Sequence, residues 1–252
     1  MIDNFDDIFK EYIIFLKAQK LYKKKLVVEY EHSIEKLYNW ESINDQKLLT
    51  TWFKQIKKNH PAKIKFQRLH LLNDWIFDKK KGIIQHKSKK FFKVIGVRTT
   101  QSGREVSNWD QPFIMQVGYK GGIIGLIRKK INGIPHYLIE AKFEPGNFGK
   151  IQLSPTLQAT YSNLERAHNG QKNFIKKNYF DKKYKTLRKY WVTEDGGRLY
   201  KKRNLHWIVN SKIKSNKIPN NNFKWMTLWQ IREFIKKKDW VSPHLRSILT
   251  LI

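Results

Sequence analysis

Apolar residues recur at helical spacing over the first part of the chain. Asp3 and Asn4 stand before them as N-cap candidates, with further acidic residues in the first turn. Two more helices are expected, over residues 26–40 and from about residue 42 to the Asn59-His60-Pro61 breaker. The residues of the first apolar face are Phe5, Ile8, Phe9, Tyr12 and Leu16. We therefore expect a helical extension over residues 1–62.

The rest of the chain, residues 63–252, changes to short apolar runs that are typical of strands. Glycine-bearing turns at Gly121-Gly122, Asn132-Gly133 and Gly196-Gly197 separate several of them, which favours antiparallel pairing. Two helices are expected at the end, over residues 227–238 and after Pro243. The runs are Phe91–Val97, Phe113–Val117, Ile123–Ile127, His136–Phe143, Ile151–Leu153 and Leu205–Val209. The predicted fold class is α+β, with one large domain behind the extension.

Composition narrows the function classes. The chain has 252 residues, 40% of them hydrophobic, which is enough apolar surface for a folded core. The absence of cysteine excludes disulfides, thiolate metal sites and a cysteine nucleophile. No basic leader opens the chain, and no apolar run approaches the roughly 20 residues of a membrane span. We expect a cytoplasmic protein without a membrane partner.

The formal net charge of +30 attracts polyanions of any kind. Most of the excess lies in scattered lysine runs, such as Lys23–Lys25, Lys79–Lys81 and Lys236–Lys238, which are typical of solvated faces. No nucleic-acid-binding motif accompanies them. The charge therefore does not by itself predict a nucleic-acid partner.

The common catalytic motifs are missing, but three dense polar segments stand out. There is no phosphate-binding loop, no GxSxG elbow, no HExxH, and no metal-ligand spacing among the eight histidines. The polar segments cover residues 103–112, residues 144–147 together with 152–160, and residues 194–198. Each places hydrogen-bonding side chains beside proline or glycine in an otherwise apolar stretch, which indicates a site rather than scaffold.

These segments, in this order, resemble the NDP-hexose 2,3-dehydratases of deoxysugar biosynthesis. Together the matching stretches span about residues 66–252, and their number and order carry the resemblance. They are Trp75-Ile76-Phe77, His86–Gly96, Gly103–Pro112, His136–Asn147, Gln152–Thr160, Glu194–Tyr200, Trp225-Met226 and Arg246-Ser247.

The resemblance implies a Nudix-like fold, a mixed or antiparallel sheet flanked by helices. It also implies a nucleoside-diphosphate 4-keto-6-deoxyhexose as substrate, and no cofactor. Members of the family carry two copies of this unit in one chain, whereas this sequence holds one copy, so a homodimer is expected to supply the second. Asp195 stands where the family pattern leads us to expect glutamate.

The implied reaction needs a base for the C3 proton, donors for the developing enolate oxygen, and an acid for the departing C2 hydroxyl. The catalytic candidates are Glu144, Glu194 and Arg198, although a loop-capping role for Glu144 and an ion pair between Glu194 and Arg198 would use the same residues. No metal ligand is expected. The substrate-binding candidates are Arg104, Trp109, Gln111, Gln152, Ser154, Thr156, Gln158, Thr160, Asn163 and Asp195. Hydrogen bonds between adjacent strands are the competing interpretation for Gln158, Thr160 and Asn163, and core packing is the competing interpretation for Trp109.

Three other functions stay open. A Nudix-like sugar-nucleotide pyrophosphohydrolase is the nearest enzyme alternative, but no helical run of carboxylates for Mg²⁺ appears. A non-catalytic nucleic-acid-binding module would use the positive charge and the aromatic content. An inactive or regulatory homologue would have much the same sequence.

Overall fold

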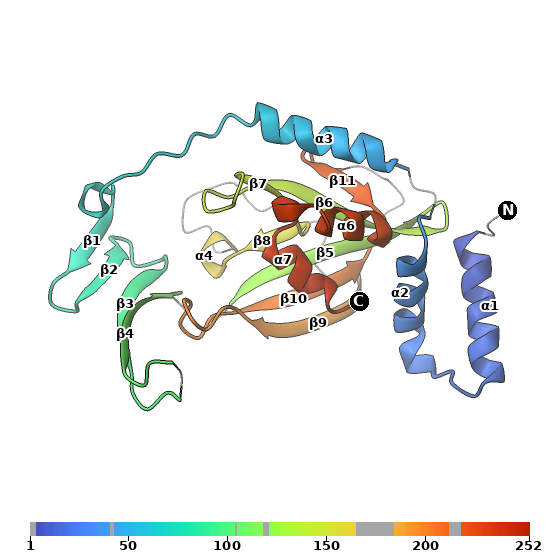
Figure 1. Ribbon diagram of the computed structural model, residues 1–252, viewed down its shortest axis with the longest axis horizontal. Helices are drawn as coiled ribbons and strands as arrows, with labels where there is room; N and C mark the ends of the chain where they lie inside the picture. The colour runs from blue at the N-terminus through green and yellow to red at the C-terminus, as the bar shows by residue number, and fades with distance from the viewer. Residues whose placement is uncertain (1–3, 41–42, 104, 118–120, 165–183, 212–217) are drawn as a thin grey trace.

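Helices from both ends of the chain flank a central sheet, and a smaller sheet lies to one side (Figure 1). The structure, a computed structural model, describes residues 4–40, 43–103, 105–117, 121–164, 184–211 and 218–252. The elements are α1 (Phe5–Ala18), η1 (Lys24–Leu26), α2 (Val27–Leu37), α3 (Gln46–Asn59), η2 (Leu69–Leu71), β1 (Trp75–Asp78), β2 (Ile83–His86), β3 (Lys93–Thr99), β4 (Trp109–Met115), β5 (Gly122–Ile131), β6 (Ile134–Phe143), β7 (Ile151–Ser154), β8 (Leu157–Ala159), α4 (Tyr161–Leu164), β9 (Lys185–Thr193), β10 (Arg203–Asn210), β11 (Phe223–Met226), α6 (Leu228–Ile235), η3 (Lys238–Trp240) and α7 (Pro243–Leu249). This order confirms the predicted α+β class.

The main sheet contains seven strands in the part of the chain that the structure describes. Its order is β11-β6-β5-β10-β9, with β7 paired to β6 and β8 paired to β5. Strands β5 and β10 are parallel and the other pairs are antiparallel, so the sheet is mixed. The turn expected at Asn132-Gly133 joins β5 to β6, and both residues have positive φ. The two residues of that turn adopt the conformation that Asn and Gly accept most readily.

The main hydrophobic core lies between this sheet and helices α3, α6 and α7. Local sequence sets where the last two helices begin. Thr227 caps α6 in a capping box with Gln230, and Ser242 caps α7 ahead of Pro243 at the first helical positions. Both helices therefore start where their caps predict, and their apolar faces lie in the core.

Helix α3 belongs to the expected N-terminal extension, and its apolar face packs into the main core. Leu49 and Phe53 are fully buried there, and the Phe53 ring lies 4.9 Å from the Trp240 ring, measured between centroids. The Trp52 indole donates to Asn221 O at 2.8 Å. The division of the chain at residue 62 stays a prediction. Helix α3 precedes that position, and its buried residues belong to the same core as the main sheet that follows it.

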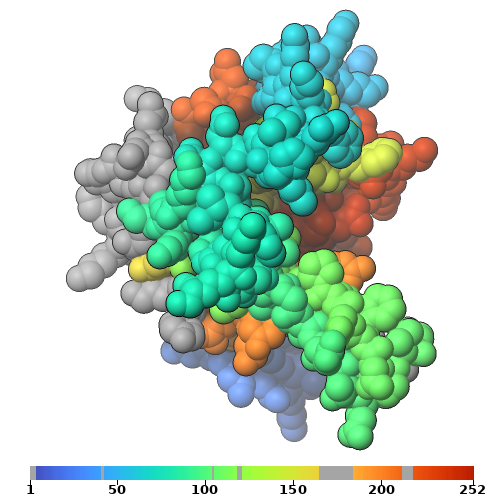
Figure 2. All heavy atoms as spheres, turned by 90° about the vertical axis from the view of Figure 1, so that its left-hand side faces the viewer, coloured from blue at the N-terminus to red at the C-terminus, as the bar shows by residue number. Residues whose placement is uncertain are grey.

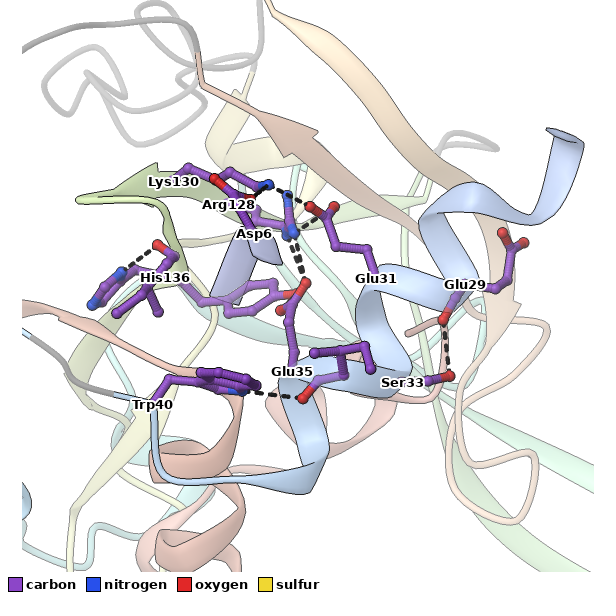
Figure 3. Close-up of polar contacts among 12 residues, drawn as sticks. Asp6, Glu29, Glu31, Ser33, Glu35, Trp40, Arg128, Lys130 and His136 are labelled. Atoms are coloured by element: carbon purple, nitrogen blue, oxygen red, sulfur yellow. Dashed lines mark hydrogen bonds and ion pairs between the residues drawn. The ribbon is translucent and has the colours of Figure 1, made fainter. Parts of the chain in front are cut away.

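Helices α1 and α2 are held to the main sheet by a buried ionic cluster centred on Arg128 of β5 (Figure 3). Its guanidinium donates to Glu35 Oε1 at 2.6 Å through Nη2 and pairs with Glu31 Oε2 at 2.7 Å. Tyr137 donates to the other Glu35 oxygen at 2.7 Å, and Lys130 pairs with Glu31 at 2.8 Å. Burial opposes charge on Arg128, but the neighbouring carboxylates outweigh it and raise the pKa of Arg128. The guanidinium thus stays charged and joins α2 to the sheet, while Asp6 of α1 pairs with Lys130 at 2.8 Å.

Strands β1 to β4 form a separate antiparallel sheet, called here the side sheet. Its order is β1-β2-β3-β4, and it meets the main body through the bridge between Ile114 and Leu199. Backbone hydrogen bonds from Ile114 N to Arg198 O, 3.0 Å, and from Tyr200 N to Ile114 O, 2.9 Å, fix this junction. In the space-filling view from its side, this sheet stands in front of the main body (Figure 2). Residues of the junction therefore line the space between the two sheets.

Strands β2, β8, β9 and β11 are not among the predicted runs, and one predicted turn differs from the structure. Strand β9 was not predicted, because it is an edge strand with charged and exposed residues where a buried strand would be apolar. Gly121 and Gly122, expected in a turn, stand at the start of β5; residues 118–120 of the same run lie outside the described residues. A Cβ on Gly121 would lie 2.0 Å from Arg203 O, so this glycine is needed for close approach of β10 rather than for a turn.

Candidate functional site

Glu194, Asn204, His206 and His244 form a polar group, called here the Glu194 cluster, on the face of the main sheet that α7 covers. Glu194 follows β9, Asn204 and His206 lie on β10, and His244 is in the first turn of α7. Asn204 Nδ2 donates to Glu194 Oε1, and His244 Nε2 lies 3.3 Å from the same oxygen. Asn204 Oδ1 accepts from Gly122 N at 3.1 Å, which ties the cluster to β5. The Glu194 carboxylate is thus held by Asn204 and His244, and Asn204 is itself anchored to the backbone of Gly122.

The electrostatics of this cluster keep its carboxylate ionised and its buried histidine neutral. The hydrogen bond with His244 lowers the pKa of Glu194, so this carboxyl is ionised at neutral pH. Burial lowers the pKa of His206, and the nearby Glu194 charge only partly opposes that effect. His206 is therefore uncharged at neutral pH, and its buried Nδ1 has no hydrogen-bond partner among the described residues. Side-chain exposures of 21% for Glu194 and 28% for His244 leave both within reach of solvent.

Arg198 lies at a cavity of about 240 Å³ that Trp109 and Gln111 of β4 also line. The Trp109 indole donates to Gln111 Oε1 at 2.9 Å, and Gln111 Nε2 donates to Gly197 O at 3.4 Å. Arg198 donates to Gly197 O at 2.8 Å, and in the described part of the chain it forms no ion pair with Glu194. The structure thus brings together three of the predicted residues, although Arg198 lies more than 80 positions from Trp109 and Gln111 in the sequence.

Asp195 and Glu144 have clear local partners. Asp195 Oδ1 accepts from Gly197 N at 2.8 Å and closes the turn between β9 and β10. Glu144 pairs with Lys142 at 2.6 Å and accepts a long hydrogen bond, 3.5 Å, from Gln158 Nε2. Burial raises the pKa of the neighbouring Glu140 to about 7, because its β6 position lacks water to solvate the charge. Gln158 and Glu144 therefore form one polar pair at the end of β6, alongside a carboxyl that titrates near neutrality.

Gln152, Ser154 and Thr156 are buried, and the first and last of them join neighbouring elements. Thr156 Oγ1 donates to Leu138 O and accepts from Ile127 N at 3.1 Å, which joins β6 to β5. Gln152 Nε2 donates to Asp239 O at 2.8 Å, and the Ser154 side chain is 1% exposed. Thr156 thus joins two strands and Gln152 joins β7 to η3, which are structural roles that the sequence did not predict for them. We leave these three out of the proposed site.

Thr160 and Asn163 line a cavity of about 410 Å³ between the main body and the side sheet. Thr160 Oγ1 accepts from Asn163 N at 3.4 Å. Lys202 lines the same cavity, and its carbonyl accepts from Glu194 N at 3.0 Å, so the cavity and the Glu194 cluster are neighbours along the β9–β10 connection. The opposite wall is aromatic and comes from the side sheet: Trp75, His86, Phe91 and Phe92. Arg104, the last of the predicted residues, lies outside the described residues.

Sequence reasoning missed His206, His244 and Lys202. Glu194 and His244 are 50 positions apart, and nothing in the sequence pairs one strand end with one distant helix start. The only local signal was Ser242-Pro243, which predicted the helix start that positions His244. Among the described residues, no group of three or more histidine or acidic side chains is arranged to hold a metal ion. Nor is any described helix both long and apolar enough to cross a membrane.

Comparison with known proteins identifies the family. A sequence model described as NDP-hexose 2,3-dehydratase matches residues 46–252. The chain belongs to this family. Three curated relatives are named dTDP-4-dehydro-6-deoxy-alpha-D-glucopyranose 2,3-dehydratase. One from Streptomyces violaceoruber is 31% identical over 214 residues, which is 82% of this chain and 46% of that protein. One from Saccharopolyspora spinosa is 32% identical over 75% of this chain and 38% of that protein, and one from Amycolatopsis orientalis is 32% identical over 72% and 39%.

The NDP-hexose 2,3-dehydratase match covers the main sheet, the side sheet and the Glu194 cluster, and it leaves α1 and α2 outside. The chain spans less than half the length of the curated relatives it matches. Among solved structures it is similar to the C. elegans Ap4A hydrolase, with a TM-score of 0.29 and 15% identity over 51% of this chain and 92% of that one. It is also similar to RenU, a Nudix hydrolase from M. smegmatis, with a TM-score of 0.31 and 12% identity over 62% and 96%.

Proposed function

We propose that this protein removes water across C2 and C3 of a nucleoside-diphosphate 4-keto-6-deoxyhexose. The names of the curated relatives support the reaction and suggest a dTDP sugar as the substrate. The observation that carries the proposal for this chain is the Glu194 cluster: an ionised carboxylate, held by His244, lies beside an uncharged buried histidine and next to a cavity large enough for a ligand.

The chemistry divides among few groups. The C4 ketone acidifies the C3 hydrogen, so a base removes that proton and an enolate forms with its charge on the C4 oxygen. The C2–O bond then breaks, and the departing hydroxide takes a proton and leaves as water. The enol that remains tautomerises to a 3,4-diketo-2,6-dideoxy sugar. No electron is gained or lost overall, so the proposed reaction needs no redox cofactor. We propose that Arg198, rather than a metal ion, stabilises the charge on the C4 oxygen.

We assign Glu194 as the base, because its lowered pKa keeps it ionised and Asn204 and His244 fix its orientation. Arg198 is the proposed donor toward the developing oxyanion, since a guanidinium stays charged and offers paired N–H groups. Glu144 is the proposed acid for the leaving hydroxyl; since it pairs with Lys142 at 2.6 Å, it must take up a proton before it can donate one. Trp109 and Gln111, which line the Arg198 cavity, are the proposed contacts to the sugar.

We further propose that the working form is a cytoplasmic homodimer. The curated relatives are more than twice as long as the stretch they share with this chain, so a second copy would provide a comparable amount of structure. Two identical subunits related by a two-fold axis are the commonest way to supply such a partner. Sedimentation equilibrium tests this directly, and a single species of 30.3 kDa would refute the dimer.

Turnover of the substrate tests the proposed reaction. The purified protein is incubated with dTDP-4-keto-6-deoxyglucose, and in parallel with the GDP, CDP and UDP sugars, while a 3-ketoreductase and NADPH trap the product. We expect NADPH consumption with one carrier. Glu194→Gln and Glu144→Gln should each lower the rate by about 100-fold or more, as expected for loss of an acid or base. Glu233→Gln, a change on the surface of α6, serves as the control. Release of a nucleoside monophosphate instead, dependent on a divalent cation, would show a pyrophosphohydrolase.

A further inference from the structure

Two neighbouring cavities share one wall at the junction of the side sheet and the main body. The cavity of about 410 Å³ described above adjoins another of about 570 Å³, and both are lined by Gln116 and Lys202. Each volume lies within the range of small-molecule sites, roughly 300–1,000 Å³. The first cavity has an aromatic wall, and the second is lined by several basic side chains.

Gln116 stands between the two cavities with its side-chain amide unsatisfied. Both Oε1 and Nε2 are buried, and neither has a hydrogen-bond partner among the described residues. A buried amide without partners is costly, and such groups are commonly paired when a ligand or water is present. The side chain offers one acceptor beside one donor, which matches the adjacent donor and acceptor on the edge of a nucleobase. An inorganic anion alone would satisfy only the donor.

The aromatic end suits a planar ring. Trp75 lies 4.8 Å from Phe92 and 5.7 Å from His86, and His86 lies 4.6 Å from Phe91, all between ring centroids. These four side chains line the smaller cavity and come from β1, β2 and the segment that leads into β3. Aromatic side chains of this kind bind bases by stacking on their faces, with little preference for sequence.

The other end suits phosphates. Four basic side chains line the larger cavity, and no acidic side chain lines either of the two. The Arg203 guanidinium lies 4.6 Å from the centre of the Trp191 ring, which restrains the side chain at the cavity wall. The four residues are Lys93, Lys201, Lys202 and Arg203. Such a cluster attracts a diphosphate through charge-assisted hydrogen bonds.

We propose that these neighbouring cavities bind the nucleoside diphosphate end of the substrate. The base would lie against the aromatic wall and pair with Gln116, and the diphosphate would lie at Lys202 and Arg203. The inference rests on the proposed function only in taking the substrate to be a sugar nucleotide. The sugar then extends past Lys202 toward the Glu194 cluster, to which the Lys202 carbonyl is hydrogen bonded.

Calorimetric titration of the full chain tests the proposal without any dehydration. The ligands are dTDP, UDP, GDP and CDP. Thymidine and pyrophosphate are titrated separately, as the nucleoside part and the diphosphate part of dTDP. We expect one or more of the diphosphates to bind at least about tenfold more tightly than either half, because base and phosphates occupy one site. Equal affinity for pyrophosphate and every diphosphate would overturn the role of the aromatic end and of Gln116.

Two substitutions separate the ends of the site. Gln116→Leu keeps the volume and removes the amide, so the Kd for the preferred diphosphate should rise at least about tenfold while the Kd for pyrophosphate stays the same. Lys202→Met should weaken both. Gln67→Leu, an exposed glutamine outside both cavities, should change neither. Unaltered diphosphate binding by Gln116→Leu would overturn the inference.

The two proposals fail in different ways. Diphosphate binding that depends on Gln116, without turnover of any 4-keto sugar nucleotide, would refute the dehydratase and leave this site standing. Turnover that Gln116→Leu leaves unchanged in both kcat and KM would refute this site and leave the dehydratase standing.

Discussion

Replacing Arg128 by methionine should destabilise the protein severely. The Arg128 side chain is 2% exposed and is paired with Glu35, also 2% exposed, and with Glu31. Methionine fills much of the same volume, but among the described residues it leaves the buried Glu35 carboxylate with only Tyr137 as a donor. Glu31 keeps Lys130 as a partner at 2.8 Å, so the cost falls mainly on Glu35.

Removal of one partner from a buried ion pair costs about 3–5 kcal/mol, because the remaining charge stays in a poorly solvating environment. For a protein of this size each 1 kcal/mol lowers Tm by about 2–4 °C, so Arg128→Met should lower Tm by about 6–20 °C. Urea unfolding followed by tryptophan fluorescence and by far-UV circular dichroism gives the free energy of unfolding and checks whether the transition has one step.

A second change tests the cause. Glu35→Gln in the Arg128→Met background removes the unpaired charge and keeps an acceptor for Tyr137, so it should recover more than about 1.5 kcal/mol. The control is Arg98→Met, which breaks the exposed pair with Asp110 and should leave the unfolding midpoint almost unchanged. The reasoning is wrong if Arg128→Met changes the free energy of unfolding by less than about 0.5 kcal/mol, or if Glu35→Gln makes it worse.

Three further changes have defined outcomes. Thr227→Ala removes one half of the capping box with Gln230 and should cost about 1 kcal/mol in denaturant unfolding, whereas Thr227→Ser should cost little; equal effects would contradict the cap. Burial, helped by nearby positive charge, lowers the pKa of His32 to about 3, so the unfolded chain binds the proton more readily. The free energy of unfolding should therefore fall as pH drops below 6.5, and His32→Leu should reduce its slope against pH by up to about 1.4 kcal/mol per pH unit. An unchanged slope would refute this role of His32. Gly121→Ala places a Cβ 2.0 Å from Arg203 O and should cost more than about 2 kcal/mol; a wild-type Tm would show that the strands separate freely.

Helix starts could be predicted from the sequence because their caps are local. Asn4 caps α1 as expected and accepts from Asp7 N, and the last two helices begin close to their predicted starts, at the caps Thr227 and Ser242. Strand β9 could not be predicted, since an exposed edge strand has no buried face and therefore no alternating pattern. The parallel pairing of β5 with β10 was also beyond the pattern, because it joins segments that are far apart in the chain.

The candidate site was predicted in part for a similar reason. Resemblance to a family pointed to Glu194, Arg198 and Trp109, which lie at neighbouring sites on the structure. The same polar composition also pointed to Thr156, whose hydroxyl instead links two strands. The residue type alone does not distinguish a hydroxyl that binds substrate from one that binds a neighbouring strand. Only the fold separates them, and only the fold brings His244 to Glu194.

The measurement that tests the central claim most directly is the conversion of dTDP-4-keto-6-deoxyglucose in D₂O, followed by NMR and mass spectrometry. Elimination and tautomerisation predict loss of one water and a deuteron from solvent at C2 of the trapped product, with both signals reduced in step by Glu194→Gln. A sugar nucleotide recovered with its C2 hydroxyl intact would contradict the account, as would cleavage of its diphosphate.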